Sequence, residues 1–259
     1  MKVRKPIYAT LATGALSAAA LLFAASPAVA ATQSYQATLS SLNNSSASGT
    51  LMLTLDGNQA TITEHVTGLA ATFSGAPYPH VQHIHINGAG QCPTTAADTN
   101  NDGVINTTEG GPSYGPIGTT LSTSGPTTPA AGTVLTIAPS CATIDYSRTI
   151  TLDAATTSAI QANKAVIVVH GLDPATLSTK AQGEKSDLVP SLPLAATSPT
   201  ACGVLAVSQM SAVPTGGVAT GAGGTSGTEN TGLFVLGGSL LAGAAVVFGT
   251  RRFAAAKVS

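Results

Sequence analysis

Apolar and polar residues alternate along two segments near the start of the chain, Ser34–Leu39 and Gly49–Leu55. Alternation with a period of two turns one set of side chains toward a core and the other toward solvent, which is typical of β-strands. Asp56-Gly57 favours a tight turn into a third strand over Gln59–Val66. The pattern therefore predicts antiparallel strands joined by short connections.

Further short runs of β-branched or apolar residues follow, with turns rich in Gly, Pro, Ser and Thr between them. These runs are His80–Ile86, Thr119–Ser122, Thr133–Ile137, Arg148–Leu152, Ala165–His170 and Gly203–Val207. Such spacing predicts an all-β fold, an antiparallel sandwich or barrel. One helix is expected over Ala154–Ala162, where Asp153 is its cap. The segment Gly171–Ser198 is rich in Pro and polar residues and is expected to be a loop.

The N-terminus has the pattern of a secretory signal peptide. A basic start (Lys2, Arg4, Lys5) precedes a long apolar run, and Ala28-Val29-Ala30 is the small-x-small pattern that signal peptidase accepts. The alternative, an uncleaved anchor, does not account for that cleavage pattern. We therefore expect residues 1–30 to be removed and the mature chain to lie outside the cytoplasm.

A second apolar run near the C-terminus, Gly232–Gly249, is followed at once by Arg251 and Arg252. As a helix this run would span about 27 Å, enough to cross a hydrocarbon core, and the arginines would stay on the cytoplasmic side. We expect membrane anchoring rather than a buried core helix, because a Gly/Thr/Ser linker isolates the run. The expected regions are an exported β domain (31–210), the linker (211–231), a transmembrane helix (232–250) and a cytoplasmic tail (251–259).

The exported part of the chain is acidic. It has four basic residues (Arg148, Lys164, Lys180 and Lys185) against eleven acidic ones, a net charge of −7. This charge excludes nucleic acid as a partner and suits cations. Outside the cytoplasm the three cysteines allow one disulfide and one free thiol, in any of three pairings.

Three histidines are candidate metal ligands. His83 and His85 are two residues apart in a predicted strand, so both imidazoles project from the same face. His170, at the end of the apolar strand Ala165–Val169, is the candidate third ligand.

The sequence around these histidines resembles the copper/zinc superoxide dismutases. Pro79–His85, followed by Gly90-Gln91-Cys92, resembles the copper-ligand strand and the first disulfide cysteine of that family. Val168-Val169-His170 resembles the strand that supplies a later copper histidine. Ala201–Val207 resembles the closing strand, which carries the second disulfide cysteine.

The resemblance covers about residues 35–210 and implies a Greek-key β-barrel of the copper/zinc superoxide dismutase type. It implies a disulfide between Cys92 and Cys202, which leaves Cys141 as the spare thiol. The copper ligands that it implies are His83, His85 and His170.

Two parts of the family's pattern are missing. No histidine lies between Cys92 and His170, where the family places its bridging and zinc ligands. We therefore expect no zinc site and three copper imidazoles instead of four. Ser198-Pro199-Thr200-Ala201 stands where the family has an arginine that steers and docks the small anion. The chain is thus more similar to the non-enzymatic chordin-type (CHRD) domains, and His80 matches a structural histidine.

Residues 98–109 match the twelve-residue calcium-binding loop, with Gly103 at position six. The expected calcium ligands are Asp98, Asn100, Asp102, the backbone carbonyl of Val104, Asn106 and Glu109. A polar surface turn is the alternative, but it explains the composition and not the spacing. Gly110-Gly111-Pro112 is expected to stop any helix after Glu109, so the loop should be isolated. Calcium would then take the structural place of zinc beside the histidines.

Three functions fit these observations. The favoured one is a surface-anchored, metal-binding domain with a dismutase-like fold and no dismutase turnover. The second is a copper-only superoxide dismutase of the cell envelope, and the third is a structural or adhesive module. A hydrolase is disfavoured, because the chain has no G-x-S-x-G motif and no evident paired base.

Overall fold

A computed structural model describes residues 32–208 of the chain. The signal peptide, the linker, the anchor and the tail that the sequence predicts lie outside these residues. Within residues 32–208, no helix is long and apolar enough to span a membrane.

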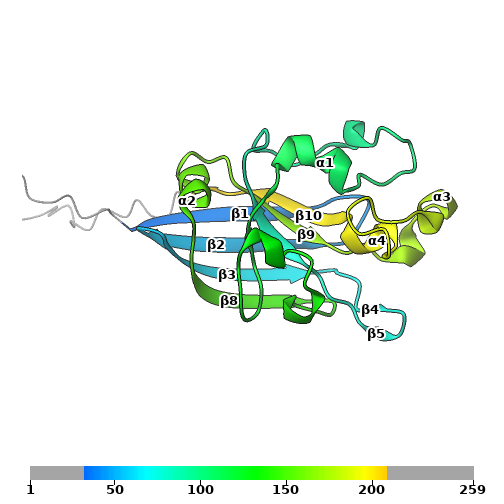
Figure 1. Cartoon of the computed structure of the whole chain (residues 1–259), viewed down its shortest axis with the longest axis horizontal. Helices are drawn as coiled ribbons and strands as arrows, with labels where there is room; N and C mark the ends of the chain where they lie inside the picture. The colour runs from blue at the N-terminus through cyan, green and yellow to red at the C-terminus, as the bar shows by residue number, and fades with distance from the viewer. Residues whose placement is uncertain (1–31, 209–259) are drawn as a thin grey trace, which may run out of the picture. The chain divides into compact units, whose positions relative to one another are not determined.

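A curled antiparallel sheet, shaped as a half-barrel, is the framework of the described residues (Figure 1). Its nine strands are β1 (Gln33–Ser41), β2 (Ser48–Asp56), β3 (Gln59–Thr67), β6 (Gln82–His85), β7 (Ile117–Thr120), β8 (Ile144–Thr151), β9 (Val166–His170), β10 (Pro199–Val204) and β11 (Ala206–Val207). In space they follow the order β7-β6-β9-β10-β1-β2-β3-β8, with β11 beside β1. A separate small hairpin pairs β4 (Thr72–Phe73) with β5 (Ala76–Pro77). The prediction of a mostly β fold is confirmed.

Short helices occupy the connections between strands. The α-helices are α1 (Thr107–Tyr114), α2 (Ala154–Gln161), α3 (Thr179–Gly183) and α4 (Leu194–Thr197). The 3-10 helices are η1 (Thr95–Ala97), η2 (Pro129–Ala131), η3 (Leu135–Ile137) and η4 (Pro174–Thr176). The expected helix after Asp153 is confirmed as α2, and the Asp153 side chain accepts a hydrogen bond from the backbone N–H of Thr156.

Three local predictions were wrong. Residues 133–137 form no strand, and the last three of them form η3. Leu135 there is 41% exposed, so its apolar side chain lies at the surface and does not pack against the sheet. Residues 171–198 contain α3, α4 and η4, which the Pro-rich composition concealed. Gly110-Gly111-Pro112 was expected to stop any helix after Glu109, but α1 begins directly after residue 106 and continues through these three residues. Asn106 and Glu109 form a reciprocal capping box, which stabilises the first turn despite the Gly-Gly-Pro that follows.

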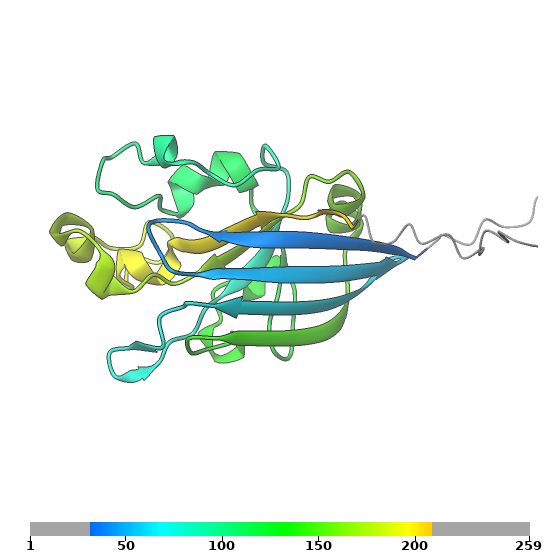
Figure 2. The same ribbon diagram turned by 180° about the vertical axis from the view of Figure 1, so that it is seen from behind.

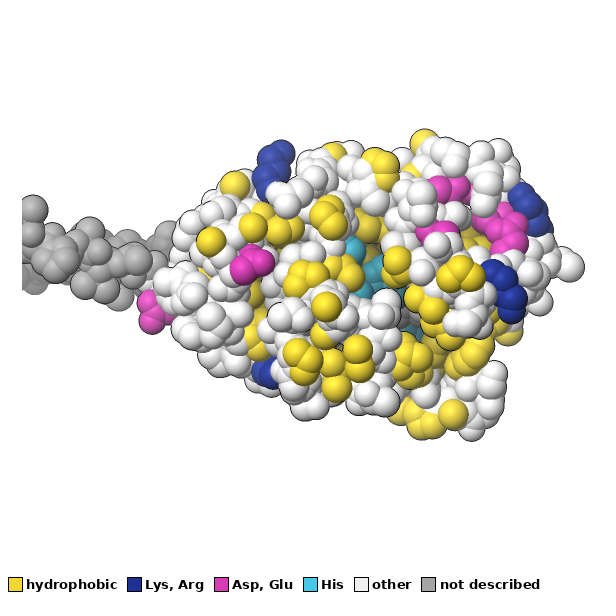
Figure 3. Space-filling model, in the orientation of Figure 1, with side chains coloured by type: hydrophobic (Ala, Val, Ile, Leu, Met, Phe, Trp, Pro, Cys, Tyr) yellow, Lys and Arg dark blue, Asp and Glu magenta, His cyan; other side chains and the backbone are white. Residues whose placement is uncertain are grey.

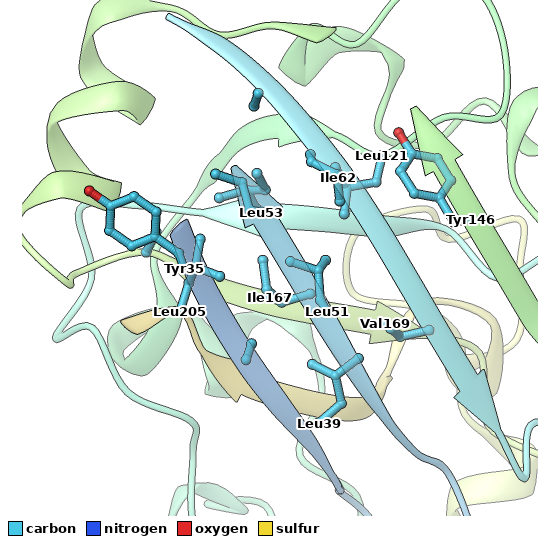
Figure 4. Packing of buried hydrophobic residues seen from close by; sticks show 14 of the residues in the cluster. Tyr35, Leu39, Leu51, Leu53, Ile62, Leu121, Tyr146, Ile167, Val169 and Leu205 are labelled. Atoms are coloured by element: carbon cyan, nitrogen blue, oxygen red, sulfur yellow. The ribbon is translucent and has the colours of Figure 1, made fainter. Parts of the chain in front are cut away.

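The core lies on the concave side of the sheet. β2 and β3 alternate strictly between exposed and buried residues over most of their length, as the period-two pattern predicts. Figure 2 shows β1, β2, β3 and β8 side by side as one face of the sheet. Leu51, Leu53 and Ile167 are fully buried and pack in the space that the sheet encloses (Figure 4).

The two edge strands, β7 and β8, are connected by a side chain rather than by a ladder of backbone hydrogen bonds. The Arg148 guanidinium on β8 donates to the carbonyl and hydroxyl oxygens of Ser122 at 2.8 and 2.7 Å, and to the Gly125 carbonyl at 2.8 Å. Both acceptors follow β7 in the chain. Arg148 therefore holds together the two edges of the half-barrel.

A disulfide joins Cys92 and Cys202, as the resemblance implies, and Cys141 is a free, exposed thiol. Cys92 lies in the connection after β6, and Cys202 lies in β10. The bond therefore ties the long connection that carries α1 to the sheet.

Replacing Cys92 and Cys202 together by Ser should lower the free energy of unfolding by about 3–5 kcal/mol, because the bond closes a loop of 110 residues in the unfolded chain. Urea unfolding followed by circular dichroism measures this change. The control is Cys141→Ser, which should change the free energy of unfolding by less than about 0.5 kcal/mol. An equal effect of the two variants would contradict a structural role for the disulfide.

Glu64 is a buried carboxyl group inside the core, 4% exposed and on the same face of β3 as Ile62 and Val66. Neither of its oxygens has a hydrogen-bond partner among the described residues. Burial raises the pKa of the Glu64 carboxyl to about 8, and the neighbouring Gln82 amide partly offsets this. The group is therefore mostly protonated at neutral pH. The Tyr146 hydroxyl is close enough for the Glu64 charge to raise the pKa of Tyr146, which the Arg148 guanidinium lowers.

Glu64→Gln should stabilise the domain increasingly as the pH rises from about 5 to about 8. The folded chain holds a proton that the unfolded chain releases near pH 4.5, so its free energy of unfolding falls across this window and levels off above it. The difference between variant and parent should grow by up to about 1.4 kcal/mol per pH unit. Urea unfolding of both proteins at several pH values measures it, and a difference independent of pH would contradict the buried neutral carboxyl.

Candidate metal centre

Strands β6 and β9 bring three histidines to one face of the sheet. His83 pairs with Val168 and His85 pairs with Val166 across the antiparallel ladder. His170 follows two residues after Val168, so its side chain shares that face. The alternate residues of the same strands, among them Ile84 and Ile167, point into the core. Period-two geometry thus separates the face that carries the histidines from the face that packs in the core.

The three imidazoles converge. His83, His85 and His170 each offer one nitrogen, and these three atoms lie within 4.8 Å of one another. The ring centroids are 5.2 to 5.9 Å apart, and all three side chains are at most 4% exposed. Among residues 32–208, these three histidines form the one group of at least three potential metal-binding side chains that are close enough to share an ion. The predicted convergence is confirmed.

Each imidazole is fixed by a hydrogen bond to a backbone carbonyl. His83 Nε2 donates to Gly132 at 3.0 Å, His85 Nδ1 donates to Gly115 at 2.7 Å, and His170 Nδ1 donates to Thr197 at 2.6 Å. A carbonyl only accepts, so these contacts assign the proton to the bonded nitrogen of each ring. The other nitrogens (His83 Nδ1, His85 Nε2 and His170 Nε2) are buried and have no hydrogen-bond partner. Three lone pairs are thus left for an ion.

Two of the three carbonyl acceptors belong to glycines that no larger residue would replace. A Cβ on Gly115, where φ is +87°, would collide with the backbone of Ile86 and Gly88. A Cβ on Gly132 would collide with the side chain of Ile117 and press on His83 Nε2. The close approach of these two backbone segments is what brings their carbonyls to the rings.

Burial keeps the three imidazoles neutral. Desolvation lowers the pKa of His85 to about 3 and that of His170 to about 4. The pKa of His83 is also well below its ordinary value, first through burial and then through the other two histidines. At neutral pH each ring therefore offers a lone pair and no positive charge, which is the state that binds a metal ion.

The other two histidines of the chain have different surroundings. His80 is fully buried, and its two nitrogens contact the carbonyls of Ala70 and His170, each at 2.9 Å. It thereby holds the backbone at the end of β9, which fits a structural role. His65 lies on the solvent side of β3 and pairs with Asp145 at 2.6 Å. Neither residue joins the cluster.

A cavity of about 500 Å³ opens onto the three histidines. Figure 3 shows the histidine side chains at the floor of a hollow whose rim is mostly hydrophobic. Tyr114 at the end of α1 forms part of the wall, and its ring meets that of His85 edge to face at 4.6 Å.

The expected calcium ligands lie in the connection between β6 and α1, except for Glu109, which lies in the first turn of α1. Among the described residues the carboxyl groups of this segment do not form a metal-binding group of the kind that the histidines form. The Asp98 carboxylate accepts from the backbone N–H groups of Asp102 and Gly103, at 3.2 and 2.9 Å, and Glu109 accepts from those of Thr99 and Asn100, at 2.9 and 3.2 Å. Three other expected ligands, Asn100, Asp102 and Asn106, accept with their side-chain oxygens from the backbone N–H groups of Asp102, Val104 and Glu109, respectively. The loop is folded around its own backbone.

This acidic loop (residues 98–109) is joined to the histidine cluster on two sides. On one side it leads through α1 to Gly115, whose carbonyl holds His85. On the other side Thr107 donates to the Thr197 carbonyl, which also accepts from His170. The side-chain hydrogen bond to Asp102 raises the pKa of Glu184, so a further carboxyl group approaches the loop from the end of α3.

Sequence reasoning found the three histidines but missed their supports. Backbone carbonyls carry no side-chain signal, so Gly115, Gly132 and Thr197 could not be identified from residue types. The glycines in the long connections were the one sequence signal for these carbonyls, because glycine permits a backbone segment to approach closely. The short helices of residues 171–198 were missed in the same way, and with them the cavity wall around Leu188 and Leu192.

No known protein family matches this chain, and a search of curated proteins found no match either.

Proposed function

We propose that this protein is an exported, membrane-anchored domain that binds copper through His83, His85 and His170 and does not turn over superoxide. The observation that carries the proposal is the set of three converging lone pairs. A bound copper ion would supply redox chemistry and an acceptor position for an outside ligand. The chain itself holds the rings, fixes their protons and limits access of water.

The hydrogen bonding of the histidines supports a ligand role over a purely structural one. His80 has a carbonyl at both ring nitrogens, whereas each of the three clustered rings leaves one buried nitrogen without a partner. An unsatisfied buried polar group costs about 1–3 kcal/mol, so three of them beside one another need a compensating function. Metal-binding histidines have this arrangement, with one nitrogen on the ion and the other on a carbonyl or carboxylate.

Copper is favoured by the donor set and by the sequence resemblance. Imidazole nitrogens suit copper and zinc, and among divalent first-row ions copper binds such sites most tightly. The strand order, with β6, β9 and β10 between β7 and β1, requires crossing connections of the Greek-key kind. Together with the disulfide between Cys92 and Cys202, it supports the likeness to the superoxide dismutase fold.

Electrostatics argue against dismutase turnover. Within the described residues, no lysine or arginine lines the cavity, and the charge that acts on the pKa of His170 is the negative one of the Asp187 carboxylate. A negative charge that acts on the site repels a small anion instead of attracting it. A second ion also has no imidazole to bind, because His65 and His80 contact other groups.

Location outside the cytoplasm rests on the predicted signal peptide and the predicted anchor. The disulfide supports it, since such bonds persist in oxidising compartments. In this setting a copper-binding domain would sequester or present the ion at the cell surface.

Copper titration of the metal-free chain should show one ion bound per chain. Replacing His83, His85 or His170 singly by Ala should weaken binding by about 100-fold or more, since even loss of an outer-shell partner costs 10–100-fold. His65→Ala is the matched control and should bind like the parent. Electron paramagnetic resonance with a competing chelator measures these affinities.

The copper-loaded chain should accelerate superoxide loss no more than copper-treated His170→Ala. Binding that survives the His170 change would contradict the metal site. Superoxide turnover by the parent at a rate near the diffusion limit would contradict the assignment as a binding domain and favour the copper-only dismutase.

We also propose that the acidic loop binds calcium as a structural ion. Its spacing supports this, as do the hydrogen bonds that the Asp98 carboxylate accepts from the backbone N–H groups at positions five and six of the loop. Because the loop is bonded to both α1 and the 178–197 segment, an ion there would hold the carbonyls of Gly115 and Thr197 in place. Lys180 and Ser178 already bind the loop carbonyls of Asn100 and Asp102 at 2.8 Å.

Calcium at 10 mM should raise the melting temperature of the metal-free chain by about 3 °C. This follows from a stabilisation of about 1.4 kcal/mol at ten times a millimolar Kd. Asp98→Asn and Glu109→Gln should abolish the rise, and Asp56→Asn, at the exposed end of β2, should keep it. Differential scanning calorimetry with and without calcium decides this, and an equal rise in all four proteins would contradict a specific site.

A further inference from the structure

The cavity above the histidines has the size of a small-molecule pocket. Its volume of about 500 Å³ lies within the roughly 300–1,000 Å³ typical of such sites. Its apolar walls come from the segments that cover β6 and β9 on their outer face. The main apolar side chains that line it are Ile117, Pro129, Leu135, Leu188, Val189 and Leu192.

The lining excludes strongly hydrated ligands. Among the described residues, no Lys, Arg, Asp or Glu side chain faces the cavity, and its polar groups are limited to the histidines, Tyr114, a few threonines and backbone atoms. A small anion or a charged peptide would lose its hydrogen bonds to water on entering the cavity, and apolar walls cannot replace these bonds. A molecule with an apolar body loses no such hydration and gains from burial.

Two of the lining leucines are unusually exposed. Leu135 and Leu188 are 41% and 51% exposed, although both lie at an apolar cavity. They belong to separate segments, η3 and the connection after α3, and both line this cavity. Exposed apolar side chains gathered around a pocket are typical of a binding site without its ligand.

At the floor, three protein nitrogens leave a coordination position on a bound ion for an outside ligand. All three histidines line the cavity, so a ligand reaches the ion through the apolar chamber. The chamber therefore selects for the body of the ligand, and the ion selects for one donor atom.

We propose that the copper-loaded site binds a small neutral organic molecule with an apolar body and one metal-coordinating atom. This inference rests on the proposed function, because the donor atom needs the ion. It goes further by naming the chemical class of the ligand, which distinguishes this site from one that handles a small inorganic anion.

Two probes with the same donor atom test the inference. The full chain is loaded with copper and titrated at pH 8 with imidazole and with 4-phenylimidazole, and the copper spectrum reports binding. Burial of the phenyl ring should make 4-phenylimidazole bind about 30- to 100-fold tighter than imidazole. Leu192→Asn and Leu135→Asn, on different walls, should each reduce this preference by about 3-fold or more and leave imidazole affinity unchanged.

The matched control is Met52→Asn, a substitution at a 41% exposed residue that lies outside this cavity and should keep the full preference. Copper binding with equal affinity for the two probes would overturn the inference and leave the metal site intact. Failure of the chain to bind copper would overturn the proposed function and the inference together. A preference that persists in both leucine variants would place the phenyl group elsewhere and would also overturn it.

Discussion

Each buried imidazole of the cluster donates its one N–H to a fixed backbone carbonyl, and the rest of the site depends on this constraint. The bond to Gly132, Gly115 or Thr197 decides which nitrogen of the ring is protonated and how the ring is turned. Without this hydrogen bond a neutral imidazole could carry its proton on either nitrogen, and the three lone pairs would not be directed at one position. The strands place the three histidines on one face of the sheet, and the carbonyls of the connections orient their rings.

Those carbonyls are themselves held by elements far apart in the sequence. The acidic loop sets the start of α1 through the capping box of Asn106 and Glu109, and α1 ends at Tyr114, directly before Gly115. The same loop contacts Ser178 and Lys180, in the segment that leads to Thr197. The disulfide anchors this whole connection to β10. A cation in the loop would therefore act on the metal centre through backbone position rather than through charge.

Much of the sheet could be predicted from the sequence, because β1, β2 and β3 bury alternate residues and carry a clear period-two signal. His83, His85 and His170 could be predicted as a group for the same reason, once β6 and β9 were identified. Residues 133–137 misled the prediction, since a surface apolar run has the same local composition as a short strand. The half-barrel edges, the Arg148 bridge and the carbonyl supports depend on long-range contacts between backbone segments, and no local pattern encodes them.

The decisive measurement is the position of the proton on each of the three histidine rings. Long-range ¹H–¹⁵N correlation spectra of the metal-free chain at neutral pH distinguish the two tautomers and the imidazolium of each ring. We expect neutral rings, with the proton on Nε2 of His83 and on Nδ1 of His85 and His170. We also expect copper(I) to shift only the three unprotonated nitrogens. Protonated rings, or tautomers whose three free nitrogens are not those that face one another, would contradict a metal site held by backbone carbonyls.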